Sequence, residues 1–232
     1  MKLVQNARYV RYLSELMGTA GLLCAVIGSG IKAEQLAGGN IGLALLANAA
    51  VTMLALFVFI EIFAPTSGAH FNPAVSLVML MKHQLSPLQF LGYVLAQLLG
   101  AAAGVWLAHL MFGQPLLQVY SKSTLHLEHY IAEIIATAGL LLVALRAPSS
   151  KVALLVACYI GAAIWFTASA SFANPAGVFA RMLSNTFAGV APSDALPLIL
   201  AQLLGCFLAF GMDRLLSPAL PASIMTSSEN AN

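Results

Sequence analysis

Six long apolar stretches constrain the fold of this chain more than any other feature of its sequence. They cover residues 12–31, 41–63, 88–112, 130–145, 152–167 and 196–212. A helix needs about 20 mostly apolar residues to cross a membrane, so the fourth and fifth stretches need flanking residues to span it. Only 8% of the residues are charged, whereas soluble domains have roughly 25%. The sequence therefore predicts an all-α membrane protein with six transmembrane helices.

Two further apolar segments, residues 71–81 and 172–187, are too short to cross a membrane. Each carries an Asn-Pro step at or near its start. Short apolar helices of this kind are typical of re-entrant segments. Irregular backbone at membrane depth is tolerated only where protein or a water-filled cavity surrounds it. These two segments therefore predict a pore.

The sequence repeats itself at three places in the same order. Residues 14–23 resemble residues 132–141, residues 71–74 resemble residues 173–176, and residues 95–100 are identical to residues 200–205. Each repeat holds three spans and one re-entrant segment, so an odd number of spans turns the second repeat upside down in the membrane. We expect one channel domain over residues 1–232, with inverted halves of about 1–113 and 128–225 and a disordered tail at 226–232. Small-residue faces at residues 100–104 and 205–209 predict close packing between these halves.

The Asn-Pro-Ala triplet occurs once in each repeat. Its residues are Asn72, Pro73 and Ala74, and Asn174, Pro175 and Ala176. One triplet alone could simply start a helix, because Asn is a good N-cap and Pro suits the first helical position. Two triplets in inverted repeats would instead bring two helix N-termini together at the midplane. Their positive dipole ends would oppose cations there, while the asparagine amides could donate hydrogen bonds to neutral hydroxylated solutes.

The segment Ser67-Gly68-Ala69-His70-Phe71-Asn72-Pro73-Ala74-Val75, together with the second Asn-Pro-Ala, resembles the signatures of the major intrinsic proteins, the aquaporin family. The glutamate-led repeats and the two Ala-Gln-Leu-Leu-Gly segments extend the resemblance over nearly the whole chain. It implies an aquaporin-like fold, a passive channel in a lipid bilayer, and a homotetramer with one pore per protomer.

The expected selectivity filter departs from the family pattern. Most members place an arginine directly after the second Asn-Pro-Ala, where this chain has Gly177, and the nearest pattern is that of bacterial aquaglyceroporins associated with arsenic resistance. Counting without gaps gives Thr52, Ala162 and Ser171 as the other filter positions. All four residues are small and uncharged, so we expect a wide filter that passes glycerol-like polyols, urea-like solutes, water and neutral metalloid hydroxides such as arsenous acid. A water-selective aquaporin, a coupled secondary transporter and a structural membrane protein with a vestigial pore are the alternatives.

Four other residues are candidates for the site. Glu15 and Glu133 lie inside predicted spans, where a carboxylate is a functional candidate by default, and they could either couple ions or anchor the loops before the half-helices. His70 could contact solute or only support the loop. Arg181 lies one helical turn beyond Gly177, so it could supply a displaced positive charge at the pore mouth or extend to the membrane interface.

The basic residues predict the orientation of the chain. The side that would hold both termini carries Lys2, Arg8, Arg11, Lys82, Arg146, Lys151 and Arg214, and the other side carries Lys32, Lys122 and Arg181. By the positive-inside rule both termini are cytoplasmic, and short loops fit a bacterial inner membrane. A net charge of +2 gives no reason to expect a nucleic-acid partner. No arrangement of residues indicates an enzyme, a metal site or a cofactor.

Overall fold

In a computed structural model, residues 2–120 and 125–217 are described, and they form eight helices and no strand. The helices are α1 (Lys2–Leu36), α2 (Ile41–Ser67), α3 (Pro73–Met81), α4 (Pro87–Met111), α5 (Leu127–Arg146), α6 (Val152–Phe166), α7 (Pro175–Met182) and α8 (Pro192–Leu216). The predicted tail at 226–232 and Lys122 lie outside the described residues. The predicted re-entrant helices are present, but α7 ends at Met182, five residues before the predicted end of its segment.

Within the described ranges, five helices are long and apolar enough to cross a membrane: α1, α2, α4, α5 and α8. The chain is therefore an integral membrane protein. Flanking residues lengthen α5 as predicted, but α6 has 15 residues, a length of about 22 Å against about 30 Å of hydrocarbon. After α6 the chain forms a turn and an irregular loop over residues 168–174, which leads to the start of α7.

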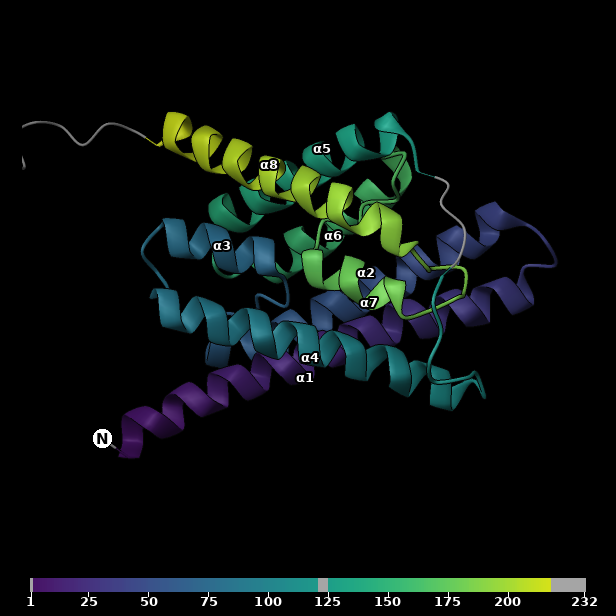
Figure 1. The fold of residues 1–232 in the computed structure, drawn as a ribbon. Coiled ribbons are helices and arrows are strands. Elements are labelled where there is room, and N and C mark those ends of the chain that lie inside the picture. Colours follow the sequence, from purple (N-terminus) through teal and green to yellow (C-terminus); the bar gives the residue numbers. More distant parts are fainter. Residues whose placement is uncertain (1, 121–124, 218–232) are drawn as a thin grey trace, which may run out of the picture.

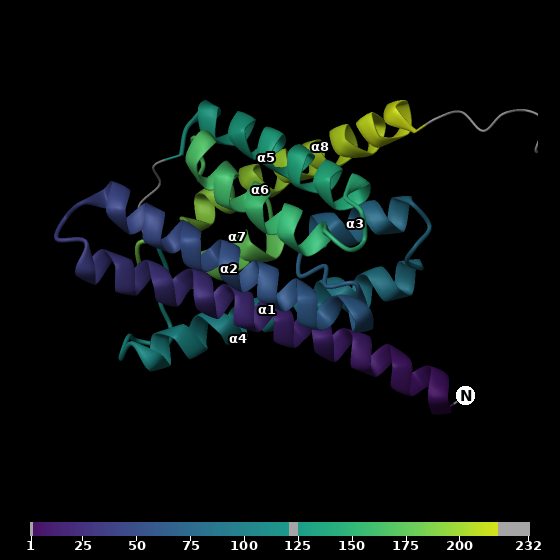
Figure 2. The ribbon, with the colours of Figure 1, turned by 180° about the vertical axis from the view of Figure 1, so that it is seen from behind.

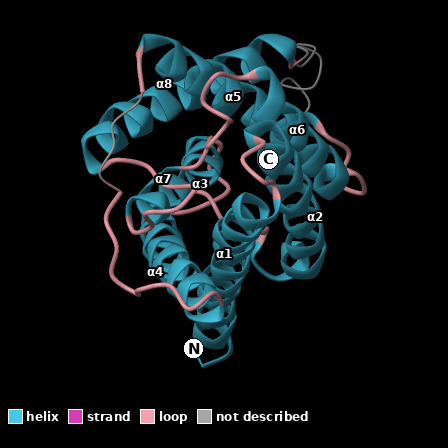
Figure 3. Cartoon of the chain, turned by 90° about the vertical axis from the view of Figure 1, so that its right-hand side faces the viewer, coloured by secondary structure: helices cyan, strands magenta, loops and turns pink. Residues whose placement is uncertain are grey.

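The helices form a bundle that surrounds the two short helices. α1 packs on α2 and α4, α5 packs on α6 and α8, and α2 packs on α6. A view along the bundle shows α3 and α7 in its centre (Figure 3). The start of α1 and the end of α8 lie at one end of the bundle, which we call the terminal end (Figures 1 and 2).

Glycines set the closest helix contacts. A Cβ atom on Gly100 would lie 2.3 Å from the Leu16 carbonyl oxygen of α1, and one on Gly205 would lie 2.6 Å from the Ile134 carbonyl oxygen of α5. These small-residue faces therefore let two backbones touch, as predicted. The predicted partners were wrong, however, because the contacts join α4 to α1 and α8 to α5, within each repeat and not between the repeats.

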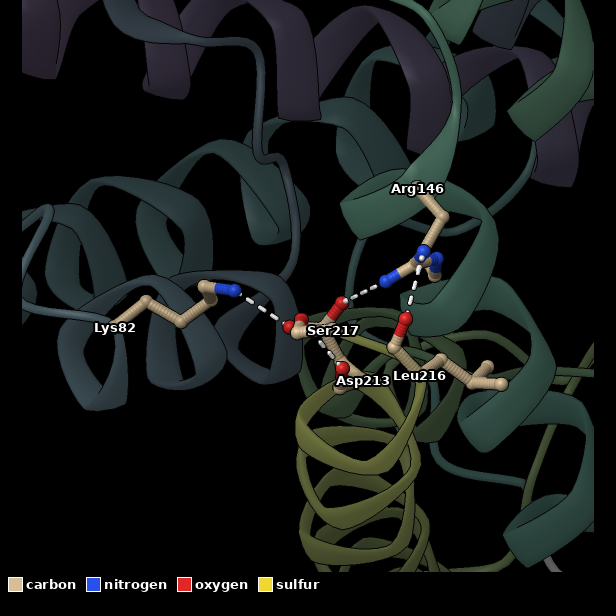
Figure 4. A network of polar contacts seen from close by, with 5 residues as sticks. All are labelled: Lys82, Arg146, Asp213, Leu216 and Ser217. Atoms are coloured by element: carbon tan, nitrogen blue, oxygen red, sulfur yellow. Dashed lines mark hydrogen bonds and ion pairs between the residues drawn. The ribbon is translucent and has the colours of Figure 1, made fainter. Parts of the chain in front are cut away.

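A cluster of charged residues joins the repeats at the terminal end (Figure 4). Asp213 of α8 accepts a hydrogen bond from Lys82, which follows α3, at 2.5 Å, and another from Arg146 of α5 at 3.3 Å. Arg146 also donates to the Leu216 carbonyl oxygen at 3.3 Å. The Asp213 side chain is 5% exposed, so this carboxylate fixes the outer end of α3 to the second repeat.

Candidate functional site: a pore between two half-helices

The two asparagines start the two half-helices in the same way. Each is an N-cap with extended backbone followed by proline. The Asn72 Oδ1 atom accepts from the Ala74 amide at 2.8 Å, and the Asn174 Oδ1 atom accepts from the Ala176 amide at 3.0 Å. The capping role expected from a single triplet is therefore present in both copies.

The side-chain amides of the same asparagines join the half-helices to each other. Asn72 Nδ2 donates to the Ala173 carbonyl oxygen at 2.7 Å, and Asn174 Nδ2 donates to the Phe71 carbonyl oxygen at 2.9 Å. These crossed bonds place the N-terminus of α3 against that of α7, and the two helices then diverge toward opposite ends of the bundle (Figure 1). An amide nitrogen carries two N–H groups, so each asparagine keeps one donor for a passing solute.

The loops before the half-helices hold an uncommon backbone conformation. Ala69 and Phe71 in the first loop have φ angles of 50° and 49°, and Ser171 and Ala173 in the second have 49° and 45°. This left-handed region costs an L-residue roughly 1–2 kcal/mol. The conformation must therefore be fixed by contacts made elsewhere.

Glu15 fixes the first loop. Its carboxylate accepts hydrogen bonds from the Ser67 hydroxyl at 2.6 Å, the His70 amide at 2.9 Å, the Phe71 amide at 2.7 Å and the Gln97 side chain at 2.8 Å. The glutamate is fully buried in α1. Its acceptor oxygens are thus used by the loop and by α4.

Glu133 fixes the second loop through the same contacts. It accepts from the Ser169 hydroxyl at 2.6 Å, from the Phe172 and Ala173 amides at 2.8 Å each, and from Gln202 at 2.6 Å. It is also fully buried. The geometry of both carboxylates matches the loop-anchoring interpretation of the sequence.

A cavity of about 150 Å³ runs past both loops, whereas a water molecule needs roughly 10–15 Å³ of such space. One wall is apolar, because α2 and α6 present residues four apart along one face. The other wall contains the loops and both asparagines. The apolar residues of this wall are Leu56, Ile60, Val152, Val156, Ile160 and Ile164, and Thr52 adds one hydroxyl group to it.

Three of the four predicted filter residues line this cavity: Thr52, Ser171 and Gly177. Ala162 does not line it, because this residue is exposed on the outer surface of α6. Ile160 and Ile164 of the same helix face the cavity instead. Side chains two residues apart in a helix point about 200° away from each other. An error of two residues in the gap-free count therefore moved the predicted position to the opposite face of α6. The wall is therefore bulkier at this place than predicted.

Two hydroxyl groups beside the cavity have no partner within residues 2–120 and 125–217. The Thr52 Oγ1 and Ser171 Oγ atoms are both buried without a hydrogen bond. Buried polar groups are nearly always satisfied by protein or water. These hydroxyls are therefore placed to bond water or solute in the cavity.

His70 and Arg181 both line the cavity. His70 Nδ1 lies 3.0 Å from the Ser76 hydroxyl, which also accepts from Gln97, so its ring is tied to the anchoring network. Arg181 lies over the Phe172 ring, 4.4 Å from the ring centroid.

Sequence reasoning missed Phe172, Met79 and Ile164, all of which line the cavity. The repeat carried a signal for two of them. Phe172 precedes Asn174 by two residues, as His70 precedes Asn72, and Met79 follows Asn72 by seven residues, as Arg181 follows Asn174. The described part of the chain contains no group of three residues that could hold a metal ion.

Comparisons with known proteins agree with this geometry. Residues 2–164 match the family described as Major intrinsic protein. Aquaglyceroporin AqpS of Rhizobium meliloti (strain 1021) is 44% identical over 225 residues, which are 95% of this chain and 96% of the relative. Aquaporin TIP2-2 of Zea mays is 34% identical over 133 residues, which are 56% of this chain and 53% of the relative.

A solved structure shares the fold. The X-ray structure of the aquaglyceroporin from Plasmodium falciparum superposes with a TM-score of 0.67 at 20% identity, covering 91% of this chain and 98% of that chain. At this identity the match supports the aquaporin-like arrangement of helices alone. The family match over residues 2–164 and the 44% identity to AqpS over 95% of the chain show the family as well: this chain belongs to the major intrinsic protein family.

Proposed function

We propose that this protein is a passive channel for small uncharged solutes: glycerol-like polyols, urea-like solutes, water and neutral metalloid hydroxides such as arsenous acid. The observation that carries the proposal is the cavity beside the end-to-end half-helices, with asparagine amides on one wall and an apolar stripe on the other. A solute with hydroxyl groups on one side and carbon on the other fits such walls. A cation would lose its hydration shell beside two positive helix ends.

The family supports this proposal at a coarser level. Major intrinsic proteins are passive membrane channels, and this chain is accordingly a channel and not an enzyme. The 44% identical relative is named an aquaglyceroporin, which favours solutes larger than water. The arsenous acid substrate rests on the filter pattern at Gly177 and on the resemblance given by the sequence.

The proposed filter consists of Thr52, Ser171 and Gly177, with Ile164 in the place expected for Ala162. Gly177 has no side chain, so the pore is open where the family usually has an arginine. Phe172, Ile164 and Arg181 also line the cavity. This favours a filter narrower than four small residues would make, and it keeps a water-selective channel as the second candidate.

A coupled transporter is less well supported. The two buried carboxylates that could bind a coupling ion each accept four hydrogen bonds from loop and helix donors. We further propose a homotetramer in a bacterial inner membrane, with both termini cytoplasmic.

Stopped-flow light scattering on proteoliposomes tests the function. Wild type should pass glycerol and arsenous acid faster than empty vesicles, and Gly177→Arg should slow both at least about tenfold, which corresponds to about 1.4 kcal/mol of added barrier. A Cβ atom at position 177 would meet nothing closer than 3.4 Å, so the backbone of α7 leaves room for a side chain to start there. The matched control is Gly211→Arg, at an exposed site of α8 with nothing within 4 Å, which should keep wild-type flux. Fast water with negligible glycerol flux in wild type would instead identify a water-selective channel.

A further inference from the structure

Arg181 occupies an unusual place for a cation in this pore. It lies four residues after Gly177 on α7, so the two positions share one face of the helix, and both line the cavity. Its guanidinium lies over the Phe172 ring at 4.4 Å from the centroid. A cation over an aromatic face is attracted by the ring quadrupole, so Phe172 holds the charge in the cavity wall.

The repeat supports this placement independently. Met79 stands seven residues after Asn72, as Arg181 stands seven residues after Asn174, and Met79 also lines the cavity. The same register thus turns toward the cavity on both half-helices. The fold therefore determines that residue 181 lies on the side of α7 that faces the cavity.

The donors of Arg181 have no partner in the protein as described. Among residues 2–120 and 125–217, its guanidinium donates no hydrogen bond, although it carries five N–H groups. Phe172 covers one face of the guanidinium plane and offers no acceptor for its edges. The buried Thr52 and Ser171 hydroxyls, which also line the cavity, lack partners among the described residues as well. Three hydrogen-bonding side chains therefore line the cavity without a hydrogen-bond partner among the described residues.

The charges around the cavity have one sign. Its described lining contains Arg181 and no carboxylate, and the two helix N-termini add partial positive charge. The nearby Glu133 is enclosed behind the loop, where four donors surround it. A cation entering the pore would therefore meet the positive charge of Arg181 with no carboxylate in the cavity lining to bind it.

We propose that Arg181, held on the Phe172 ring, is the charge-selecting residue of this channel, displaced one helical turn from the position where the family usually has its arginine. Together with Thr52 and Ser171 it forms a binding site for solute oxygen atoms. The inference rests on the proposed function in one respect, that solutes pass through this cavity.

Ion entry into proteoliposomes tests the proposal. Arg181→Gln keeps an N–H donor group on a shorter side chain and removes the charge, so potassium entry should rise at least about tenfold, equivalent to about 1.4 kcal/mol of lost barrier. Arg181→Lys keeps the charge and should stay close to wild type. The matched control is Arg214→Gln, because Arg214 also lies over an aromatic ring, that of Phe210 at 4.8 Å, but is exposed and away from the cavity.

A double variant tests the displacement itself. Gly177→Arg combined with Arg181→Gln returns the charge to the position one turn deeper and should restore low potassium entry. Equal potassium entry in wild type, Arg181→Gln and Arg214→Gln would overturn the proposal, as would a rise in Arg181→Lys as large as in Arg181→Gln. Glycerol flux in the same vesicles tests the solute-channel function separately from the proposed role of Arg181. Its absence from wild type would reject the solute-channel function, while potassium entry would still decide the role of Arg181.

Discussion

At the scale of single residues, the two buried glutamates determine the shape of the pore wall. Each one accepts hydrogen bonds from two backbone amides of a loop whose residues have positive φ. Because the amides are held, the carbonyl groups between them cannot turn freely. The carboxylates thus act on the solute path indirectly, through the backbone.

Glu133→Gln should destabilise the protein. The amide group that replaces the carboxylate brings an N–H₂ donor among four existing donors, so at least one buried donor loses its acceptor, at a cost of about 1–3 kcal/mol or more. Thermal unfolding in detergent measures the loss. Glu61→Gln is the control, because Glu61 is an exposed glutamate of α2 and should leave the melting temperature unchanged. Equal melting temperatures for wild type and Glu133→Gln would show that Glu133 does not anchor the loop.

At the scale of elements, the helix pairs α1–α4 and α5–α8 depend on backbone contact at glycine. Gly205→Ala should destabilise by about 1–3 kcal/mol, because the added methyl group forces two packed backbones apart. Gly211 lies six residues further along the same helix with nothing within 4 Å of its Cβ position. Gly211→Ala should be neutral or stabilising by up to about 1 kcal/mol, since alanine favours the helix. Melting temperatures of the two variants measure this difference, and similar values would contradict the close packing of α5 and α8.

Much of the arrangement of elements was predictable, and the reason is periodicity. Apolar length predicted six spanning helices, of which five in the described ranges are long and apolar enough to cross a membrane, and the duplicated Asn-Pro-Ala gave the start of α3 and of α7. The apolar stretch at residues 152–167 gave the bounds of α6 (Val152–Phe166) closely, but the flanking residues expected to lengthen it do not continue the helix. The prediction that Ala162 belongs to the filter was wrong because the face of a helix on which a residue lies can be assigned only when the register is known to within one residue.

At the scale of the whole molecule, the two repeats meet through few but specific polar contacts. The crossed asparagine bonds join them at the centre, and Asp213 joins them at the terminal end. Arg181 illustrates what the sequence could not decide. Its spacing from Gly177 was evident, but only the fold shows Phe172 beneath it and the cavity beside it.

The orientation of the molecule can be tested with engineered cysteines. The terminal end holds most of the basic residues, so the positive-inside rule predicts that this end lies in the cytoplasm. These residues are Arg8, Arg11, Lys82, Arg146, Lys151 and Arg214. In a background with Cys24, Cys158 and Cys206 replaced by serine, Gln35→Cys at the far end of α1 should react with a membrane-impermeant maleimide in intact cells. Ser149→Cys, in the loop between α5 and α6, should react only after the membrane is opened. Both sites are exposed, so the contrast reports membrane side and not burial. Labelling of Ser149→Cys in intact cells, with Gln35→Cys protected, would reverse the orientation and put Arg181 at the cytoplasmic mouth.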